Sequence, residues 1–241
     1  MSYGYDLSTP VAYARPDERA AFVRRTYLHL AGAILAFVAV EAAIFSFFGT
    51  QNIMRFMMTY LQSGWSSLLI MGAFIGSGYL ARSWAQSRTS MAMQYTGLGL
   101  YVLAQALIFV PILAVANAYP QFQGVIPMAG ILTLCLFGGL TTAALVTRKD
   151  FSFLAPIISI GGFLLLGVIV VSMIFPNFIG LGLWFSFLAV GLAAAAILYT
   201  TSNIIHHYSL DMHVAAALEL FAAVAMLFFY ILRILMQLRS R

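Results

Sequence analysis

The chain has 241 residues, of which 63% are hydrophobic and only 8% are charged, and its net charge is +5. A soluble domain carries about 25% charged residues, so the composition excludes a soluble globular protein and indicates one embedded in a lipid bilayer. The positive charge does not indicate a nucleic-acid-binding protein, because the 12 basic residues lie in short connections and at the chain ends, where they set topology and face anionic lipid head groups.

The N-terminal segment, residues 1–25, is polar and has no apolar run followed by a small-residue cleavage site. This pattern is not that of a cleavable signal peptide, so we expect the first span to direct membrane insertion. We predict a cytoplasmic N-terminal segment over residues 1–25, a membrane domain over 26–235 and a basic C-terminal tail over 236–241.

Seven apolar stretches are each long enough to cross a bilayer, which takes about 20 helical residues. They lie near residues 26–48, 66–86, 91–115, 125–147, 154–175, 181–204 and 213–235. Most connections are short, so consecutive helices are expected to run antiparallel. The longer connection 49–65 has apolar residues at helical spacing, which predicts an additional interfacial helix. The predicted fold is an all-α integral membrane protein with a seven-transmembrane-helix bundle.

The orientation follows from Lys and Arg, which favour the cytoplasmic side. With a cytoplasmic N-terminus, the only basic residue in an outer loop is Arg55. The C-terminal end of the chain, with Arg233, Arg239 and Arg241, would then also lie outside. The basic tail leaves open a last segment that re-enters the membrane instead of crossing it. The other eight basic residues lie in inner segments: Arg15, Arg19, Arg24, Arg25, Arg82, Arg88, Arg148 and Lys149.

Small residues fall inside several spans. Cys135 is the only cysteine, which excludes an internal disulfide and a thiolate metal cluster, and we expect it to be a small buried apolar residue. Gly72 and Gly76 form a GxxxG pair, and Gly97 and Gly99 follow in the third span. We interpret these glycines as places where helices approach closely.

Two carboxylates, Glu41 and Glu219, fall within the first and last spans. An ionisable side chain at membrane depth costs at least about 2.5 kcal/mol, so by default it marks a function and requires a partner. The predicted topology places the two at different depths, and we expect them not to touch. Because Glu41 has no polar neighbour within its span, a structural role is favoured there, and it is the secondary candidate.

Polar residues at the end of the sixth span are candidate partners for Glu219. Thr200, Ser202 and Asn203 stand at about its depth in otherwise apolar sequence. A protonated Glu219 that donates a hydrogen bond to one of them would tie two helices together, whereas an ionised Glu219 would need a cation or water. Both a structural tie and an ion- or proton-responsive site therefore remain open.

The run from His206 to His213 contains three imidazoles and Asp211. Such a set suits zinc or nickel, but the spacing matches no standard motif, so we expect neither a metal site nor a cofactor. A pH-responsive loop is the alternative. The chain has no HExxH, GxSxG or nucleotide-binding glycine motif, so we predict that it is not an enzyme.

Four segments match one known family in the right order. They are residues 22–27 (FVRRTY), 147–152 (TRKDFS), 197–205 (ILYTTSNII) and the stretch from 217 to 235 that begins ALELF. Over about residues 20–238 the chain resembles the Bax inhibitor-1 family (transmembrane BAX inhibitor motif proteins), especially its bacterial members. The resemblance implies a bundle in the cell inner membrane with the last helix near the centre.

The resemblance also implies a function. Family members are associated with a pH-sensitive calcium leak attributed to two aspartates, and some bacterial members with a membrane-bound quality-control protease that they bind and modulate. The corresponding positions are Thr200 and Ala223, which cannot ionise. Glu219 lies one turn before Ala223, and our hypothesis is that it partly substitutes for the lost pair. We therefore expect a cation or calcium leak, or alternatively a non-transporting regulator of a protease.

Overall fold

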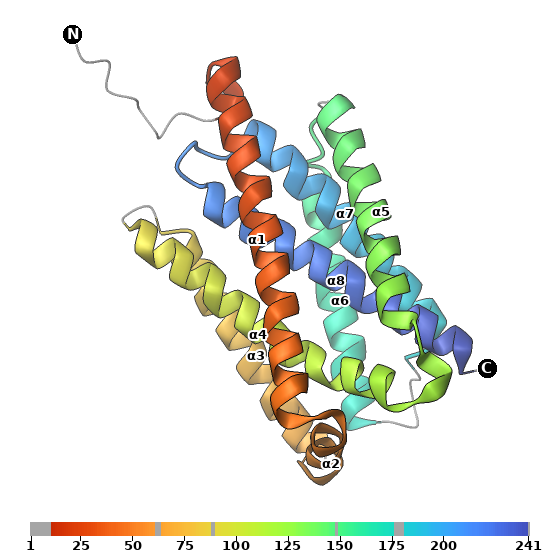
Figure 1. Ribbon diagram of the computed structural model, residues 1–241. Coiled ribbons are helices and arrows are strands. Elements are labelled where there is room, and N and C mark those ends of the chain that lie inside the picture. The colour runs from red at the N-terminus through yellow and green to blue at the C-terminus, as the bar shows by residue number, and fades with distance from the viewer. Residues whose placement is uncertain (1–10, 61–63, 88–89, 148, 176–180, 241) are drawn as a thin grey trace.

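The computed structural model describes residues 11–60, 64–87, 90–147, 149–175 and 181–240. In those residues the chain is helical almost throughout (Figure 1). The elements are η1 (Val11–Tyr13), α1 (Pro16–Phe48), α2 (Thr50–Tyr60), α3 (Gly64–Ala85), α4 (Met91–Ala118), η2 (Pro120–Phe122), α5 (Val125–Thr147), α6 (Leu154–Ile174), α7 (Leu183–His206) and α8 (His213–Arg239).

The first helix begins ten residues before the predicted span, at Pro16. Proline is favoured in the first turn because its missing N–H would be unpaired there anyway. Glu18 accepts a hydrogen bond from the backbone N–H of Arg15 at 3.2 Å and pairs with the Arg15 guanidinium at 3.1 Å. The helix ends at Phe48 and is followed by Gly49, whose φ of 72° is a conformation that other residues rarely adopt.

Helix α2 confirms that the longer connection holds an additional helix. Its Ile53 is buried, whereas Gln51, Asn52 and Arg55 are exposed. The helix packs against α4 as well as α1, so its apolar face lies against the bundle. Leu61, which belongs to the predicted helical pattern, lies outside the described residues.

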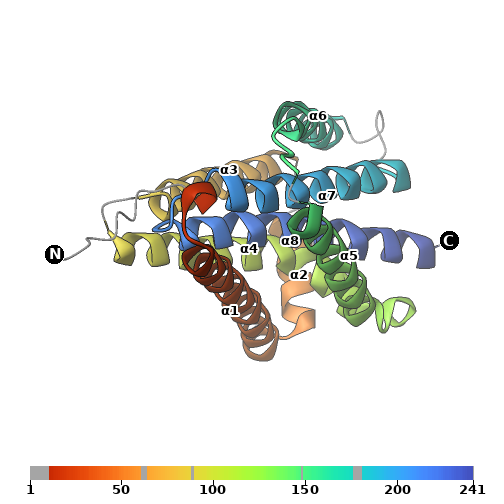
Figure 2. The same ribbon diagram turned by 90° about the horizontal axis from the view of Figure 1, so that it is seen from above.

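Helix α8 occupies the middle of the bundle. It packs against α1, α3, α4, α5 and α7, and Figure 2 shows it running between the other helices, with α6 at the edge. In the most apolar stretch of α8, 78% of the residues are buried, whereas the corresponding stretch of α6 has none. Small side chains such as Ala216, Ala217 and Ala222 allow α8 to have neighbours on every side.

Six helices among the described residues are long and apolar enough to cross a membrane: α1, α4, α5 with the turn before it, α6, α7 and α8. This finding confirms the prediction of an all-α membrane protein, with six of the seven predicted spans identified in the described residues. Helix α3, which covers the predicted second span, is 22 residues long but is not among the six.

The last helix runs the length of the bundle. It is continuous from His213 to Arg239 and ends far from the start of α1 (Figure 1). Near this end Arg233 and Gln237 both donate to the carbonyl of Leu181, at 2.7 and 3.0 Å. The C-terminal turn is therefore held against the start of α7 and does not turn back within the bundle.

Cys135 is exposed on α5, so the prediction that it is buried is wrong. Helix α5 packs through one face, on which Val125, Ala129, Thr133 and Ala144 are buried. Its outward face is just as apolar, because lipid and not water covers it in a membrane. Hydrophobicity alone therefore does not distinguish the two faces.

Only some of the predicted close contacts at glycines are present. A Cβ on Gly97 would lie 2.6 Å from both the carbonyl oxygen of Ala81 and the amide nitrogen of Ala85, so α3 and α4 touch there backbone to backbone. A Cβ on Gly72, Gly76 or Gly99 would meet nothing within 4 Å. The GxxxG pair of α3 therefore makes no close contact within the described chain.

Candidate functional site

The connection between α5 and α6 is held against α7 by Ser202. Its hydroxyl accepts a hydrogen bond from the backbone N–H of Phe151 at 3.0 Å and donates to the carbonyl of Lys149 at 3.2 Å. Within the connection, the carboxylate of Asp150 accepts hydrogen bonds from the hydroxyl and the N–H of Ser152, and these bonds lower the pKa of Asp150. Two of the four family-like segments, 147–152 and 197–205, are thus in direct contact.

Glu219 lies at the same end of the bundle, because α8 begins there. It is the seventh residue of the helix and is half-buried in an otherwise buried stretch. Its Oε1 accepts a hydrogen bond from the side-chain amide of Gln86 at 3.4 Å. Gln86 directly follows α3, so this bond joins the central helix to the connection between α3 and α4.

Tyr208, in the connection between α7 and α8, is the second neighbour of Glu219. Burial raises the pKa of its phenol most, and the negative charge of Glu219 and a hydrogen bond to it raise the pKa further. The positive charge of Arg82 acts in the opposite direction on the pKa of Tyr208. The phenol therefore stays neutral and directs its proton toward the carboxylate.

The backbone of Tyr208 is fixed as well. Its N–H donates to the carbonyl of Asn203 at 3.1 Å, and its carbonyl accepts from the N–H of Val11 at 2.8 Å. Together Glu219, Gln86 and Tyr208 form what we call the Glu219 cluster. A half-buried carboxylate with a neutral donor on two sides can exchange a proton or attract a cation from the end of the bundle.

The predicted partners of Glu219 lie elsewhere. In the part of the chain that the structure describes, Glu219 makes no hydrogen bond to Thr200, Ser202 or Asn203: Ser202 holds the connection between α5 and α6, and the carbonyl of Asn203 caps α7. Thr200 is buried, as is Ala223. The two positions that correspond to the family's aspartates are therefore enclosed and uncharged.

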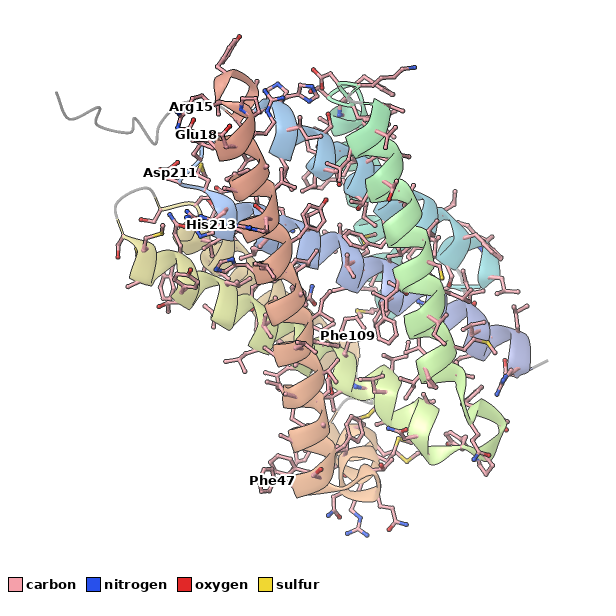
Figure 3. All side chains as sticks on the ribbon, turned by 45° about the horizontal axis from the view of Figure 1, so that its top comes forward. Arg15, Glu18, Phe47, Phe109, Asp211 and His213 are labelled. Atoms are coloured by element: carbon pink, nitrogen blue, oxygen red, sulfur yellow. The ribbon has the colours of Figure 1, made fainter. Side chains whose placement is uncertain are left out.

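A second set of polar side chains joins α1, α4 and α8. The Nε2 of His29 lies 2.8 Å from the hydroxyl of Tyr95, and the ring centroids of His29 and His213 are 4.9 Å apart. His213 is buried, and in the described residues neither its Nδ1 nor the buried Oδ1 of Asp211 has a hydrogen-bond partner. Figure 3 shows Asp211 and His213 beside α1, toward the end of the bundle at which Arg15 and Glu18 lie.

The predicted histidine run does not converge on one point. His206 bonds through Nδ1 to the carbonyl of Ser202 at 2.9 Å, His207 is exposed, and His213 faces His29. No group of three or more His, Cys, Asp or Glu side chains in the described residues could hold a metal ion. The imidazoles instead cap α7 and join α8 to α1.

Glu41 is separate from these groups. It is only 6% exposed, and neither carboxylate oxygen has a hydrogen-bond partner among the residues that the structure describes. The sequence prediction that no polar neighbour accompanies it agrees with this environment. A carboxyl group in such surroundings is costly to ionise, and it does not act as a hydrogen-bonded tie between helices.

The sequence does not reveal the two partners of Glu219. In the sequence Gln86 marks only the end of a span, and Tyr208 is only part of the histidine run. Each is a polar residue at the end of an apolar segment, which is a usable signal. Nothing in the sequence pairs Gln86 with Glu219, however, because the contact joins residues 133 positions apart, and Tyr208 reaches Glu219 only through the connection between α7 and α8.

The chain matches one protein family along nearly its whole length. The family is described as "Inhibitor of apoptosis-promoting Bax1", and the match covers residues 19–240. All the helices from α1 to α8, apart from three residues at the start of α1, lie within it.

Three relatives show how far the similarity extends. An uncharacterised protein of Pseudomonas aeruginosa is 39% identical over 124 residues, which are 52% of this chain and 55% of that protein. An uncharacterised protein of Campylobacter jejuni is 25% identical over 98% of this chain and 97% of its own length. The Golgi anti-apoptotic protein of Vaccinia virus is 26% identical over 96% of this chain and 91% of its own length. The match to the family spans the helical bundle and its connections, and this chain belongs to the Bax inhibitor-1 family.

Proposed function

We propose that this protein is a pH-sensitive cation leak of the bacterial inner membrane, with calcium as the leading candidate ion. The observation that carries the proposal is the place of Glu219, half-buried at one end of the central helix and surrounded by polar groups. Gln86 and Tyr208 can each donate a hydrogen bond to an ionised Glu219, and these bonds favour the charged form that a cation site requires. In this proposal α3 is the second of seven spans and the N-terminus is cytoplasmic.

The single carboxylate fits a leak better than a storage site. Calcium prefers six to eight oxygen ligands, several of them carboxylates. Glu219 supplies one carboxylate, and the two buried positions that correspond to the family's aspartates, Thr200 and Ala223, supply none. A site of this composition holds calcium weakly, so an ion that enters can leave again.

The test is calcium flux into liposomes that contain purified protein, measured across pH for wild type and Glu219→Gln. An ionised carboxylate attracts a cation and a protonated one does not, so wild-type flux should fall as the pH falls. The amide of Glu219→Gln cannot ionise, and its flux should be low at every pH. Glu18→Gln is the matched control, because Glu18 pairs with Arg15 in the first turn of α1, and it should behave like wild type.

Identical flux from wild type and Glu219→Gln at every pH would rule out Glu219 as the gate. Flux that depends on pH in both proteins would assign the sensor to another group, and His29 with His213 would be the next candidate.

The second candidate function is a non-transporting protein that binds and modulates a membrane-bound quality-control protease. The absence of an ionisable side chain at both Thr200 and Ala223 favours it, because the family's leak is attributed to charges at those positions. It predicts that the protease co-purifies with the protein and that its turnover of substrate changes, with no calcium flux in liposomes. Flux without any effect on the protease would contradict it.

A further inference from the structure

A large groove lies between α1, α2, α3, α4 and α6. Its volume is about 1230 Å³, which exceeds the range of about 300–1,000 Å³ that is common for small-molecule pockets. Its walls are apolar and include Ile44, Phe48, Phe56, Ile75, Leu107 and Met173. Phe48, Phe56 and Leu107 are also exposed, so the groove opens sideways, toward the bilayer in a membrane-embedded bundle.

One cation stands in this apolar groove. The guanidinium of Arg82 lies 5.7 Å from the centre of the Tyr101 ring, and both residues line the groove. Among the described residues the only ion pair is Arg15–Glu18. No described carboxylate therefore lies within 4.0 Å of the Arg82 guanidinium. A guanidinium with free donors binds a phosphate group in a two-pronged geometry and holds it more firmly than an ammonium does.

The dimensions of the groove suit an acyl chain below a head group. Arg82 is the last residue that α3 contributes to the groove and Tyr101 the first that α4 contributes, so the cation stands at one end of the groove. The α4 residues in the groove extend from Tyr101 to Pro111, which corresponds to about 15 Å of helix. The groove therefore offers an acyl chain an apolar surface of about 15 Å along α4 that leads away from Arg82.

We propose that this groove binds an anionic glycerophospholipid, with its phosphate on Arg82 and an acyl chain along α4. A partner's transmembrane helix would fill the apolar part but would leave Arg82 unpaired unless it carried an acidic residue. A lipid supplies both the apolar chain and the negative charge. The proposal does not depend on whether the Glu219 cluster conducts ions, because Glu219, Gln86 and Tyr208 do not line the groove.

The test is native mass spectrometry of the delipidated protein titrated with phosphatidylglycerol or phosphatidylcholine of the same acyl chains. Wild type should retain phosphatidylglycerol preferentially. Arg82→Gln should reduce that preference by about tenfold, which corresponds to the loss of a hydrogen bond to a charged group. Arg24→Gln is the matched control, because Arg24 is an exposed arginine of α1 outside the groove, and it should keep the preference.

A second variant tests the apolar part. Ala104 lines the groove from α4, so Ala104→Phe should fill it and reduce the retention of both lipids, while the melting temperature without lipid shows whether the variant is folded. Equal retention of the two lipids by wild type, or an unchanged preference in Arg82→Gln, would overturn the proposal. A groove that holds a co-purified membrane helix and no lipid would overturn it too.

Discussion

Replacing Gly97 with alanine is expected to separate α3 from α4 and to destabilise the protein by about 1–3 kcal/mol, the usual cost of overpacking. The new methyl carbon would lie 2.6 Å from two backbone atoms, those of Ala81 and Ala85. Backbone atoms cannot swing aside as the end of a flexible side chain can, so one helix has to move. The measurement is the melting temperature of the purified variant in detergent.

Gly99→Ala is the control for this prediction. It lies two residues further along α4, and a Cβ there would meet no atom within 4 Å. Alanine is the better helix former by roughly 0.5–1 kcal/mol, so this variant should melt at or slightly above the wild-type temperature. If Gly97→Ala and Gly99→Ala have the same melting temperature, α3 and α4 do not make the close contact described above.

Replacing Glu41 with methionine is expected to stabilise the protein by about 1–3 kcal/mol, the cost of a buried polar group without a hydrogen bond. Within the described part of the chain both carboxylate oxygens of Glu41 lack a hydrogen-bond partner, and the residue is 6% exposed. Methionine has a similar length and an apolar end, so it should fill the same space. The melting temperature should rise, and calcium flux in liposomes should stay at the wild-type level.

Glu18→Met applies the same change to the first turn of α1, where the carboxylate pairs with Arg15 and accepts from its N–H. It should give no gain, because it removes a helix cap. A lower melting temperature for Glu41→Met, or an altered flux, would mean that the Glu41 carboxyl has a partner such as an ion and contributes to function.

The main features of the fold could be predicted from the sequence. An apolar stretch of about 20 residues has to satisfy its backbone hydrogen bonds internally when lipid surrounds it, and this requirement makes it a helix whatever its neighbours are. Helices α4 to α8 accordingly lie close to the predicted spans. The central position of α8 followed only from the family resemblance, although its alanine-rich sequence suits many close neighbours.

The candidate site could be predicted only in part. Glu219 is conspicuous in sequence because a carboxylate is rare in an apolar span. Its predicted partners were chosen by depth along a neighbouring helix, and depth does not tell which face of that helix a residue occupies. Ser202 therefore lies against Phe151 and Lys149, while Gln86 and Tyr208 surround Glu219.

The sequence by itself determined that the protein is an all-helical membrane protein, where its long helices lie, and which carboxylates are exceptional, because each of these depends on the local balance of apolar and charged residues. Only the tertiary structure decided that Cys135 faces outward, that Gly97 touches α3, and that Arg82 lies over Tyr101 in an apolar groove. The physical reason is that lipid-facing and core-facing surfaces of a membrane helix are equally apolar, so the packing of one helix on another, and not hydrophobicity, selects the face that is buried.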